Sequence, residues 1–272
     1  MKTLYLSDLD GTLLRSNERL SEYTQNTVNN FTKNGMHFSY ATARSLVSAS
    51  KVTAGLTTEF PVICYNGGFI FGGNSKEILR AHYFTKSEIE YLTQTLAQHG
   101  FLPIVYAFIG GVEHFSFIEE GANDGMRHFL DARLHDPRRR QVQTVDELYT
   151  ADVFYLICMG EILQLAAIDA ILNKDKRFYS IFHKETYSDT WWCEILPAKS
   201  TKAAAALELK AMLGCEKLVA FGDGKNDIPL FTVADECYAM ANAVPELKEI
   251  ATAIINSNDN DGVAKWLERN WQ

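Results

Sequence analysis

Short apolar runs and helical patterns alternate near both ends of the chain. Five runs are apolar and end on small or polar residues: 3–6, 37–41, 61–65, 217–221 and 237–241. Between most of them lie segments with helical spacing: 19–33, 45–56, 200–213, 227–233 and 245–251. Strands that alternate with helices predict an α/β fold, with a Rossmann-like parallel sheet core and helices on both faces. Ligands bind such sheets at the carboxyl ends of the strands.

The middle of the chain has a different pattern. After Gly72-Gly73 it predicts helices over 86–99, 122–132 and 162–173, and strands around Gly110-Gly111 and over 153–159, 178–183 and 190–196. Strands joined by short turns predict an antiparallel sheet with helices on one face. We therefore expect an inserted α+β domain at 84–196 and a discontinuous core at 1–83 and 197–272.

The composition narrows the class of protein. The 272 residues carry a net charge of −8, whereas a nucleic-acid-binding protein usually has a basic face. The cluster Arg138-Arg139-Arg140 has no interleaved aromatic residues and is expected in a solvated loop. The five cysteines form no CxxC pair, which indicates core residues in a reducing compartment. Without a run long enough for a signal peptide or a membrane span, we expect a soluble cytoplasmic protein with neither nucleic-acid nor membrane partners.

Two acidic motifs follow the first and fourth apolar runs. They are Ser7-Asp8-Leu9-Asp10-Gly11-Thr12 and Gly222-Asp223-Gly224-Lys225-Asn226-Asp227. Four carboxylates gathered in one place would repel one another and raise each other's pKa unless a cation neutralised them. The pattern therefore predicts a hard divalent metal.

The first motif also suits phosphoryl chemistry. Because the chain turns at Gly11, Asp8 and Asp10 can point toward one site, where the first attacks phosphorus and the second protonates the leaving oxygen. The alternative is a strand end with an Asx turn and a helix cap. For the second motif the alternative is an ordinary turn before a capped helix.

Three further segments carry candidate ligand-binding groups. Thr42, with the neighbouring N–H groups of Ala43 and Arg44, could hold a phosphate at a helix start, although Thr42 could also be a plain cap and Arg44 could face solvent. Asn66 could donate to a substrate, or Asn66-Gly67 could form a simple turn. Lys199 and Lys202 are three residues apart, and one of them could neutralise the nucleophile and the phosphoryl oxygens. A solvated lysine is the alternative.

One segment imitates a calcium-binding loop. Ser257, Asp259, Asp261 and Gly262, with Glu268 beyond them, follow that spacing except that serine replaces the first acid. No helix of the required kind precedes the segment. We therefore predict a helix start at Asp261-Gly262 in place of a metal loop.

The motifs, in this order, resemble the haloacid dehalogenase (HAD) superfamily, and within it the Cof-type phosphatases with a large C2-type cap. This resemblance implies that Asp8 is the nucleophile, Asp10 the general acid/base and Lys202 the charge-stabilising lysine. It assigns Thr42 to the phosphate and Asn66-Gly67 and Asn226 to the substrate-binding segments. It further implies a Mg²⁺ ion held by Asp8, Asp223, Asp227 and the backbone carbonyl of Asp10.

Two positions depart from the family pattern, since Ala43 and Ala203 stand where glycine is usual. Ala43 alters the room for substrate. Because of Ala203 and the nearby Lys199, either Lys199 or Lys202 could be the active-site lysine. The inserted domain would act as a lid that excludes water and selects substrate. Candidate specificity elements within it are the Gly110-Gly111 turn and a strand with Trp191, Trp192 and Glu194.

The resulting hypothesis is a Mg²⁺-dependent phosphatase that hydrolyses small phosphomonoesters through an aspartyl-phosphate. Sugar phosphates are the family expectation, with pyridoxal phosphate and flavin mononucleotide as other options. A phosphomutase of the same superfamily is one alternative. A non-catalytic protein that binds phosphate or metal for regulation is another.

Overall fold

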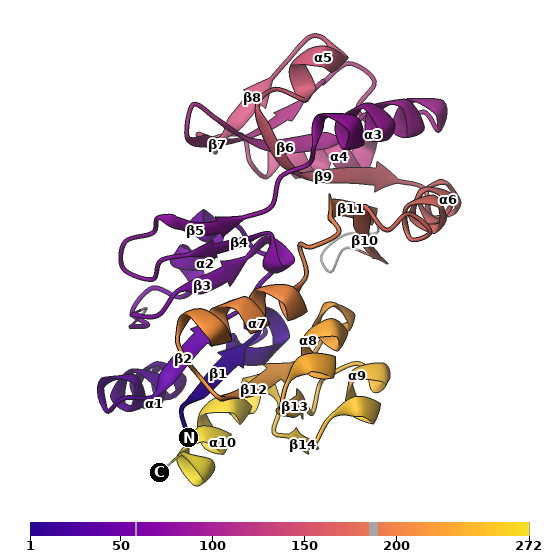
Figure 1. Cartoon of the computed structure of the whole chain (residues 1–272). Helices are drawn as coiled ribbons and strands as arrows, with labels where there is room; N and C mark the ends of the chain where they lie inside the picture. Colours follow the sequence, from indigo (N-terminus) through magenta and orange to yellow (C-terminus); the bar gives the residue numbers. More distant parts are fainter. Residues whose placement is uncertain (58, 185–189, 272) are drawn as a thin grey trace. The chain divides into compact units, whose positions relative to one another are not determined.

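The computed structural model describes residues 1–57, 59–184 and 190–271. The chain forms two compact units, Met1–Ala81 with Ser200–Gln272, and His82–Lys199. The first unit contains both termini, and the second is an insertion within it (Figure 1).

A five-stranded parallel sheet forms the centre of the first unit. Its strand order is β14-β13-β12-β1-β2, and all its pairs are parallel. Leu4 and Leu6 of the central strand β1 are fully buried, as expected for a strand that is covered on both faces. The strands are β1 (Thr3–Ser7), β2 (His37–Tyr40), β12 (Lys217–Gly222), β13 (Glu236–Met240) and β14 (Ala253–Ile255).

Helices pack around this sheet. Among them, α1 contacts α10 and α7 contacts α8 (Figure 1). The helices are α1 (Glu22–Lys33), α2 (Leu46–Val52), α7 (Lys202–Met212), α8 (Ile228–Val233), α9 (Pro245–Ile250) and α10 (Gly262–Asn270). The helices α1 and α7 begin three and two residues later than the sequence pattern predicts, because Ser21 and Thr201 cap them by accepting a backbone N–H of the first turn.

The third apolar run does not join the five-stranded parallel sheet, although the alternation of strands and helices predicts that it does. It forms β3 (Val62–Cys64), which pairs antiparallel with β4 (Phe69–Phe71), and β4 pairs in turn with β5 (Ile78–Ala81). A parallel bridge between Ala41 and Ile63 links this small sheet to the end of β2. The turn between β3 and β4 therefore starts close to the carboxyl end of β2.

The second unit has a six-stranded sheet in the order β10-β11-β9-β6-β7-β8. All its pairs are antiparallel except β7 with β8. The strands are β6 (Ile104–Ile109), β7 (Val112–Phe117), β8 (Arg139–Gln141), β9 (Asp152–Gly160), β10 (Phe178–Lys184) and β11 (Trp191–Pro197). The helices are α3 (Lys86–Gln98), α4 (Asp124–Asp131), α5 (Val145–Leu148) and α6 (Ile162–Leu172).

Helices cover both faces of this sheet, and not one face as the pattern predicts. Leu96 of α3 and Leu165 of α6 join an apolar cluster with Val105 of β6. On the other face, Phe129 of α4 packs against Phe115 and Trp192. Side chains alternate between the faces along each strand, so both faces required apolar cover.

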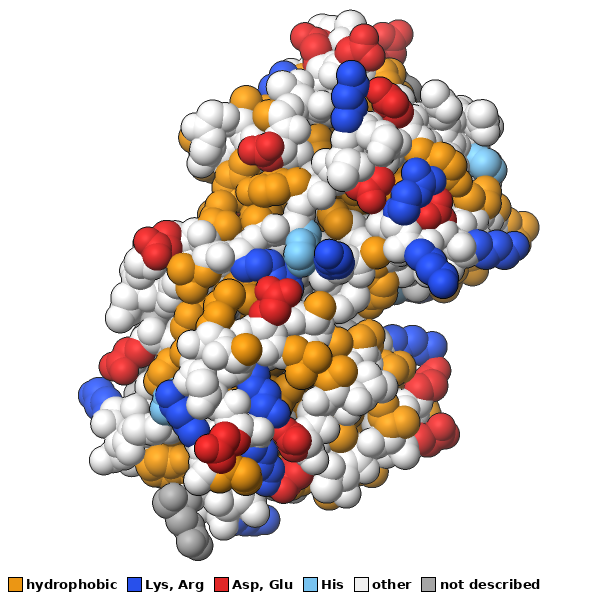
Figure 2. Space-filling model, viewed as in Figure 1, with side chains coloured by type: hydrophobic (Ala, Val, Ile, Leu, Met, Phe, Trp, Pro, Cys, Tyr) orange, Lys and Arg blue, Asp and Glu red, His pale blue; other side chains and the backbone are white. Residues whose placement is uncertain are grey.

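The basic cluster of the second unit is also not a solvated loop. Arg139 and Arg140 lie in β8, which pairs with β7, while Arg138 binds Glu113 and Asp136. On the face drawn in Figure 2, Lys and Arg side chains are interspersed with Asp and Glu. Among the described residues, no helix combines the length and the apolar character that crossing a membrane requires.

Candidate active site

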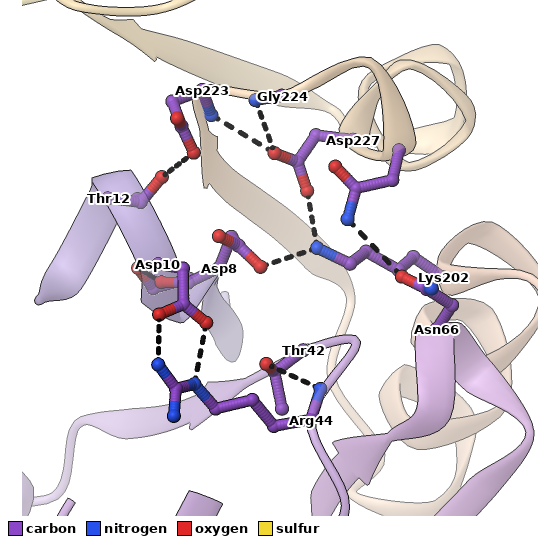
Figure 3. A network of polar contacts seen from close by, with 12 residues as sticks. Asp8, Asp10, Thr12, Thr42, Arg44, Asn66, Lys202, Asp223, Gly224 and Asp227 are labelled. Carbon is purple, nitrogen blue, oxygen red and sulfur yellow. Dashed lines mark hydrogen bonds and ion pairs between the residues drawn. The ribbon is translucent and has the colours of Figure 1, made fainter. Parts of the chain in front are cut away.

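The polar motifs of the first unit meet at the carboxyl ends of three neighbouring strands. Asp8 follows β1, Thr42 follows β2, and Asp223 follows β12 (Figure 3). Because β1 lies between the other two strands in a parallel sheet, all three chains leave the sheet at the same edge. The topology thus brings together segments that are more than 200 residues apart in the sequence.

Lys202 connects two of the carboxylates. Its Nζ donates to Asp8 Oδ1 at 2.5 Å and to Asp227 Oδ1 at 2.6 Å. The three residues are at most 5% exposed. Lys202 reaches this position from the first residue of α7, whereas Lys199 is exposed and belongs to the second unit. Of the two candidate lysines, the structure therefore brings Lys202 to the acidic group.

Asp227 is held from both sides. Its Oδ2 accepts the backbone N–H groups of Asp223 and Gly224, each at 3.0 Å. Gly222 leaves the necessary room, since a Cβ atom there would lie 2.7 Å from Asp227 Cγ. These contacts close the turn after β12 and fix the carboxylate that faces Lys202.

Asp223 is oriented by the first motif. Its Oδ1 accepts the Thr12 hydroxyl at 2.9 Å. Gly11, at φ +73°, passes so close that a Cβ atom would lie 2.2 Å from Asp223 Oδ2, so only glycine fits. The sequence alone predicts no role for Thr12, although its place directly after Asp10-Gly11 in the motif could have indicated one.

Three carboxylates share this buried space. One oxygen each of Asp8, Asp223 and Asp227 lies within 4.8 Å of the others. Burial raises the pKa of Asp8 well above its ordinary value; Asp227, Asp223 and Asp10 raise it further, and Lys202 opposes the shift. Burial and Asp227 raise the pKa of Asp223 to about 6. Burial would lower the pKa of Lys202, but Asp227 and Asp8 outweigh burial and raise it. The ammonium therefore stays charged, while the carboxylates compete for it.

The side chain of Asp10 lies outside this group. The sequence predicts four gathered carboxylates, but Asp10 points to Arg44, whose Nε and Nη2 donate to its two oxygens at 2.7 and 2.5 Å (Figure 3). Arg44 Nη2 also binds Glu18 at 2.6 Å. The pKa of Arg44 is raised, mainly by its hydrogen bonds to Asp10. Asp10 is stabilised more by a bidentate ion pair with a guanidinium than by a place among carboxylates that would repel it. Glu18 carried no sequence signal.

Thr42 is buried and does not cap α2. Its Oγ1 accepts the backbone N–H of Arg44 at 3.1 Å, while the cap is Ser45, which accepts from Ser48. Ala43 is exposed between them. The turn therefore leaves Ala43 exposed and holds the Thr42 hydroxyl at the strand end.

The Asn66-Gly67 segment joins the same region. Its backbone N–H at Asn66 donates to the Thr42 carbonyl at 2.9 Å, and Asn66 Oδ1 accepts from Asn226 Nδ2 at 3.2 Å. Tyr65, Asn66 and Gly67 have φ values of 51°, 51° and 99°. Such successive left-handed residues persist only where the surroundings hold them.

The segment that imitates a calcium loop binds protein groups. Asp261 accepts from Arg15, Ser21 and Thr24, and Asp259 accepts from Ser16. As predicted, a helix, α10, begins at Gly262. These acids tie the C-terminal part of the chain to the segment after the first motif.

Comparison with known proteins agrees with this geometry. Residues 5–267 match the family model described as haloacid dehalogenase-like hydrolase. The chain is 24% identical over 263 residues to the 5-amino-6-(5-phospho-D-ribitylamino)uracil phosphatase YitU of Bacillus subtilis, a match that covers 96% of this chain and 94% of the relative. It is 24% identical over 290 residues to YwtE of the same organism, a phosphatase with the same name, with 96% of each chain covered.

A solved structure shows the same fold. A haloacid dehalogenase-like hydrolase of B. subtilis superposes with a TM-score of 0.80 at 21% identity, and the match covers 100% of both chains. At this identity the likeness concerns the fold, which includes both units.

Proposed function

The chain belongs to the haloacid dehalogenase-like hydrolase family, and we propose that it is a Mg²⁺-dependent phosphatase that hydrolyses small phosphomonoesters through an aspartyl-phosphate. The observation that carries this proposal is the state of Asp8. Lys202 engages one of its carboxylate oxygens, and the other accepts no hydrogen bond from the described residues. A nucleophile needs such an oriented carboxylate with one free oxygen.

The donor set fits Mg²⁺. Three carboxylates and one ammonium leave a formal charge of −2 in a buried space, and hard oxygen ligands suit this ion. Asp8 and Asp223 each keep an oxygen without a described hydrogen-bond partner, whereas both oxygens of Asp227 are engaged. We propose Asp223, the Asp10 carbonyl and Oδ1 of Asp8, which keeps a second lone pair beside its bond from Lys202, as direct ligands. Oδ2 of Asp8 then stays free to attack phosphorus, and Asp227 contributes charge and orientation. When bound, the ion would neutralise charge on the transferring phosphoryl group.

In the first step the free oxygen of Asp8 attacks phosphorus. A bond from Asp8 to phosphorus forms, the bond from phosphorus to the leaving oxygen breaks, and Asp10 gives its proton to that oxygen. Lys202 stabilises the developing charge. Because Asp10 is a carboxylate paired with Arg44 in the structure, this step requires that the ion pair opens and that Asp10 first takes up a proton from solvent.

In the second step water attacks the phosphorus of the aspartyl-phosphate. Asp10 takes a proton from this water, the bond from Asp8 to phosphorus breaks, and inorganic phosphate leaves. The free enzyme is restored with Asp10 protonated again. One residue thus serves as acid and then as base, as the two half-reactions demand.

We place the phosphoryl group against the turn after β2. Thr42 donates its hydroxyl to no described residue, and Ala43 and Arg44 follow it at the strand end. On the other side, Asn226 donates to Asn66, which precedes Gly67, and these groups can orient the substrate. These groups position the substrate without taking part in the bond changes.

For the substrate class we propose phosphorylated sugars or sugar alcohols. The relatives named above act, by their names, on a phosphoribityl compound, which supports a primary phosphomonoester on a polyhydroxylated chain. The five cysteines are free and buried, which supports a reducing, cytoplasmic location.

The test is phosphate release from a panel of sugar, sugar-alcohol, nucleotide and cofactor phosphates and one aryl phosphate. Activity should require Mg²⁺, disappear with EDTA, and fall at least about 10³-fold in Asp8→Asn. Asp124→Asn, the same change at an exposed carboxylate of the second unit, is the matched control and should keep full activity. Activity that survives Asp8→Asn would exclude the aspartyl-phosphate.

A further inference from the structure

Two residues of the first unit, Arg80 and Lys202, lie close in sequence to the connections between the units. The chain leaves the first unit after Ala81 and returns at Ser200. Arg80 precedes the outgoing connection, and Lys202 follows the returning one by two residues. The two residues belong to the same unit, so their surroundings can be compared directly.

Arg80 bridges two elements of this unit. Its side chain is 9% exposed, and its Nε donates to Glu208 Oε2 at 2.5 Å. Its Nη1 donates to the carbonyl oxygen of Gly67 at 2.6 Å. Glu208 lies on α7, the helix that starts at Lys202. One guanidinium thus holds the turn after β3 and the helix of the proposed catalytic lysine at a fixed separation.

Gly67 is packed directly onto the start of that helix. A Cβ atom at Gly67 would lie 2.1 Å from the carbonyl oxygen of Thr201 and 2.8 Å from the backbone nitrogen of Lys202. The turn and the first peptide of α7 are therefore in backbone contact. A shift of the turn has to be passed on to the backbone of Lys202, since close-packed groups do not absorb displacement.

The turn itself needs an external restraint. Tyr65 and Asn66 are buried residues with φ of 51°, next to Gly67 at 99°. This conformation costs free energy and relaxes when its supporting contacts are removed. Arg80 supplies the hydrogen bond to the last of these residues.

We propose that Arg80 is a positioning residue for Lys202. Through Gly67 and Glu208 it holds the turn against the first peptide of α7, and this sets the ammonium of Lys202 between Asp8 and Asp227 (Figure 3). The catalytic consequence rests on the function proposed above, whereas the placement of Lys202 does not. Small displacements of a charge-stabilising group are costly to the rate because the stabilisation depends on pre-set geometry.

The test compares Arg80→Gln, Arg80→Lys and the control Lys210→Gln, which removes an ion pair with Asp235 from the same helix. With an aryl phosphate and Mg²⁺, Arg80→Gln should lower kcat by about 10- to 100-fold and change KM far less. Arg80 uses two separate nitrogens, Nε for Glu208 and Nη1 for Gly67, and the single ammonium of a lysine does not reproduce this planar geometry, so Arg80→Lys should recover only part of kcat. Thermal melts show whether each variant is folded at the assay temperature.

A second readout follows Lys202 without any activity. In protein labelled with ¹⁵N-lysine, the ammonium resonance of Lys202, identified by its loss in Lys202→Arg, should shift or broaden in Arg80→Gln and stay unchanged in Lys210→Gln. An unchanged resonance, or a kcat within about twofold of the wild type, would overturn the proposal. If the wild-type protein released no phosphate at all, the proposed function would fail, and the resonance alone would decide the role of Arg80.

Discussion

The two units bury different kinds of residue. In the first, Asp8, Asp227 and Lys202 are buried at the carboxyl ends of the strands of a parallel sheet. In the second, the core beneath the antiparallel sheet is an apolar cluster with two free cysteines, Cys158 and Cys193. Burying a charge is expensive unless it is paired. The first unit therefore carries a free-energy cost at the place where chemistry is possible. In the second unit the buried carboxylate of Glu194 lies outside the apolar cluster, 3.1 Å from His183 Nε2.

The geometry of the sheets explains this difference. Neighbouring parallel strands end at one edge, so their polar termini meet and can compensate one another. Neighbouring antiparallel strands end at opposite edges, so their termini are dispersed. In the second unit the buried polar contacts lie apart from the core, as with Arg138, Glu113 and Asp136. The comparison predicts that substitutions of buried residues will affect function and stability together at the polar site of the first unit, and stability alone in the apolar core of the second.

The largest effect is expected from Lys202→Met. It leaves Asp8 and Asp227 buried without their ammonium partner, which should lower the free energy of unfolding by about 3–5 kcal/mol and kcat by at least about 10²-fold. Urea denaturation and initial rates measure the two losses. Lys210→Met on the same helix removes a partly exposed pair with Asp235 and should cost no more than about 1 kcal/mol. Similar losses in the two variants would remove the contrast between buried and exposed charge.

The next effect concerns the apolar core of the second unit. Leu165 of α6 is fully buried in it, so Leu165→Ala should cost about 2–5 kcal/mol through lost contacts and a cavity. Leu163→Ala, the same change at a side chain that is 82% exposed on the same helix, should stay within about 0.5 kcal/mol. The Mg²⁺ concentration for half-maximal activity should not change in either variant. A shift in that concentration would contradict the expectation that the apolar core of the second unit affects stability alone.

The smallest effect is the pH dependence of stabilisation by Mg²⁺. Burial and neighbouring carboxylates raise the pKa of Asp8, and that of Asp223 to about 6. Near pH 5 the folded state then binds more protons than the unfolded state, so metal-free protein should gain stability as pH falls from 7 toward 5. Because protons compete with the ion, saturating Mg²⁺ should stabilise by about 1–3 kcal/mol near pH 7.5 and by less near pH 5.

Thermal melts with and without Mg²⁺ at the two pH values measure this effect. Asp223→Asn removes one proposed ligand and should abolish the difference. Stabilisation by Mg²⁺ that is equal at both pH values, or larger at the lower one, would contradict the assignment of these carboxylates to the ion.

Much of the site follows from local sequence. Asp8, Thr42 and Asp223 each come directly after an apolar run, and an alternating pattern places such positions at one edge of a parallel sheet. The glycines at 11 and 222 could be expected to permit close approach, although the partner of each, Asp223 or Asp227, could not be named. The alternating pattern predicts the wrong sheet for 61–65, because an apolar run does not determine the strand with which it pairs.

What the sequence by itself determined is the set of groups and their order: paired acids after two strands, a threonine after a third, a lysine at a helix start, and an inserted domain with another pattern. These depend on spacing over a few residues, where periodicity and turn chemistry act. Only the tertiary structure decided which groups meet. It selected Lys202 over Lys199, turned Asp10 toward Arg44 and Glu18, and placed Arg80 against Gly67. Such pairings depend on distances between segments far apart in the chain, and those distances are set by packing and by the compensation of buried charge.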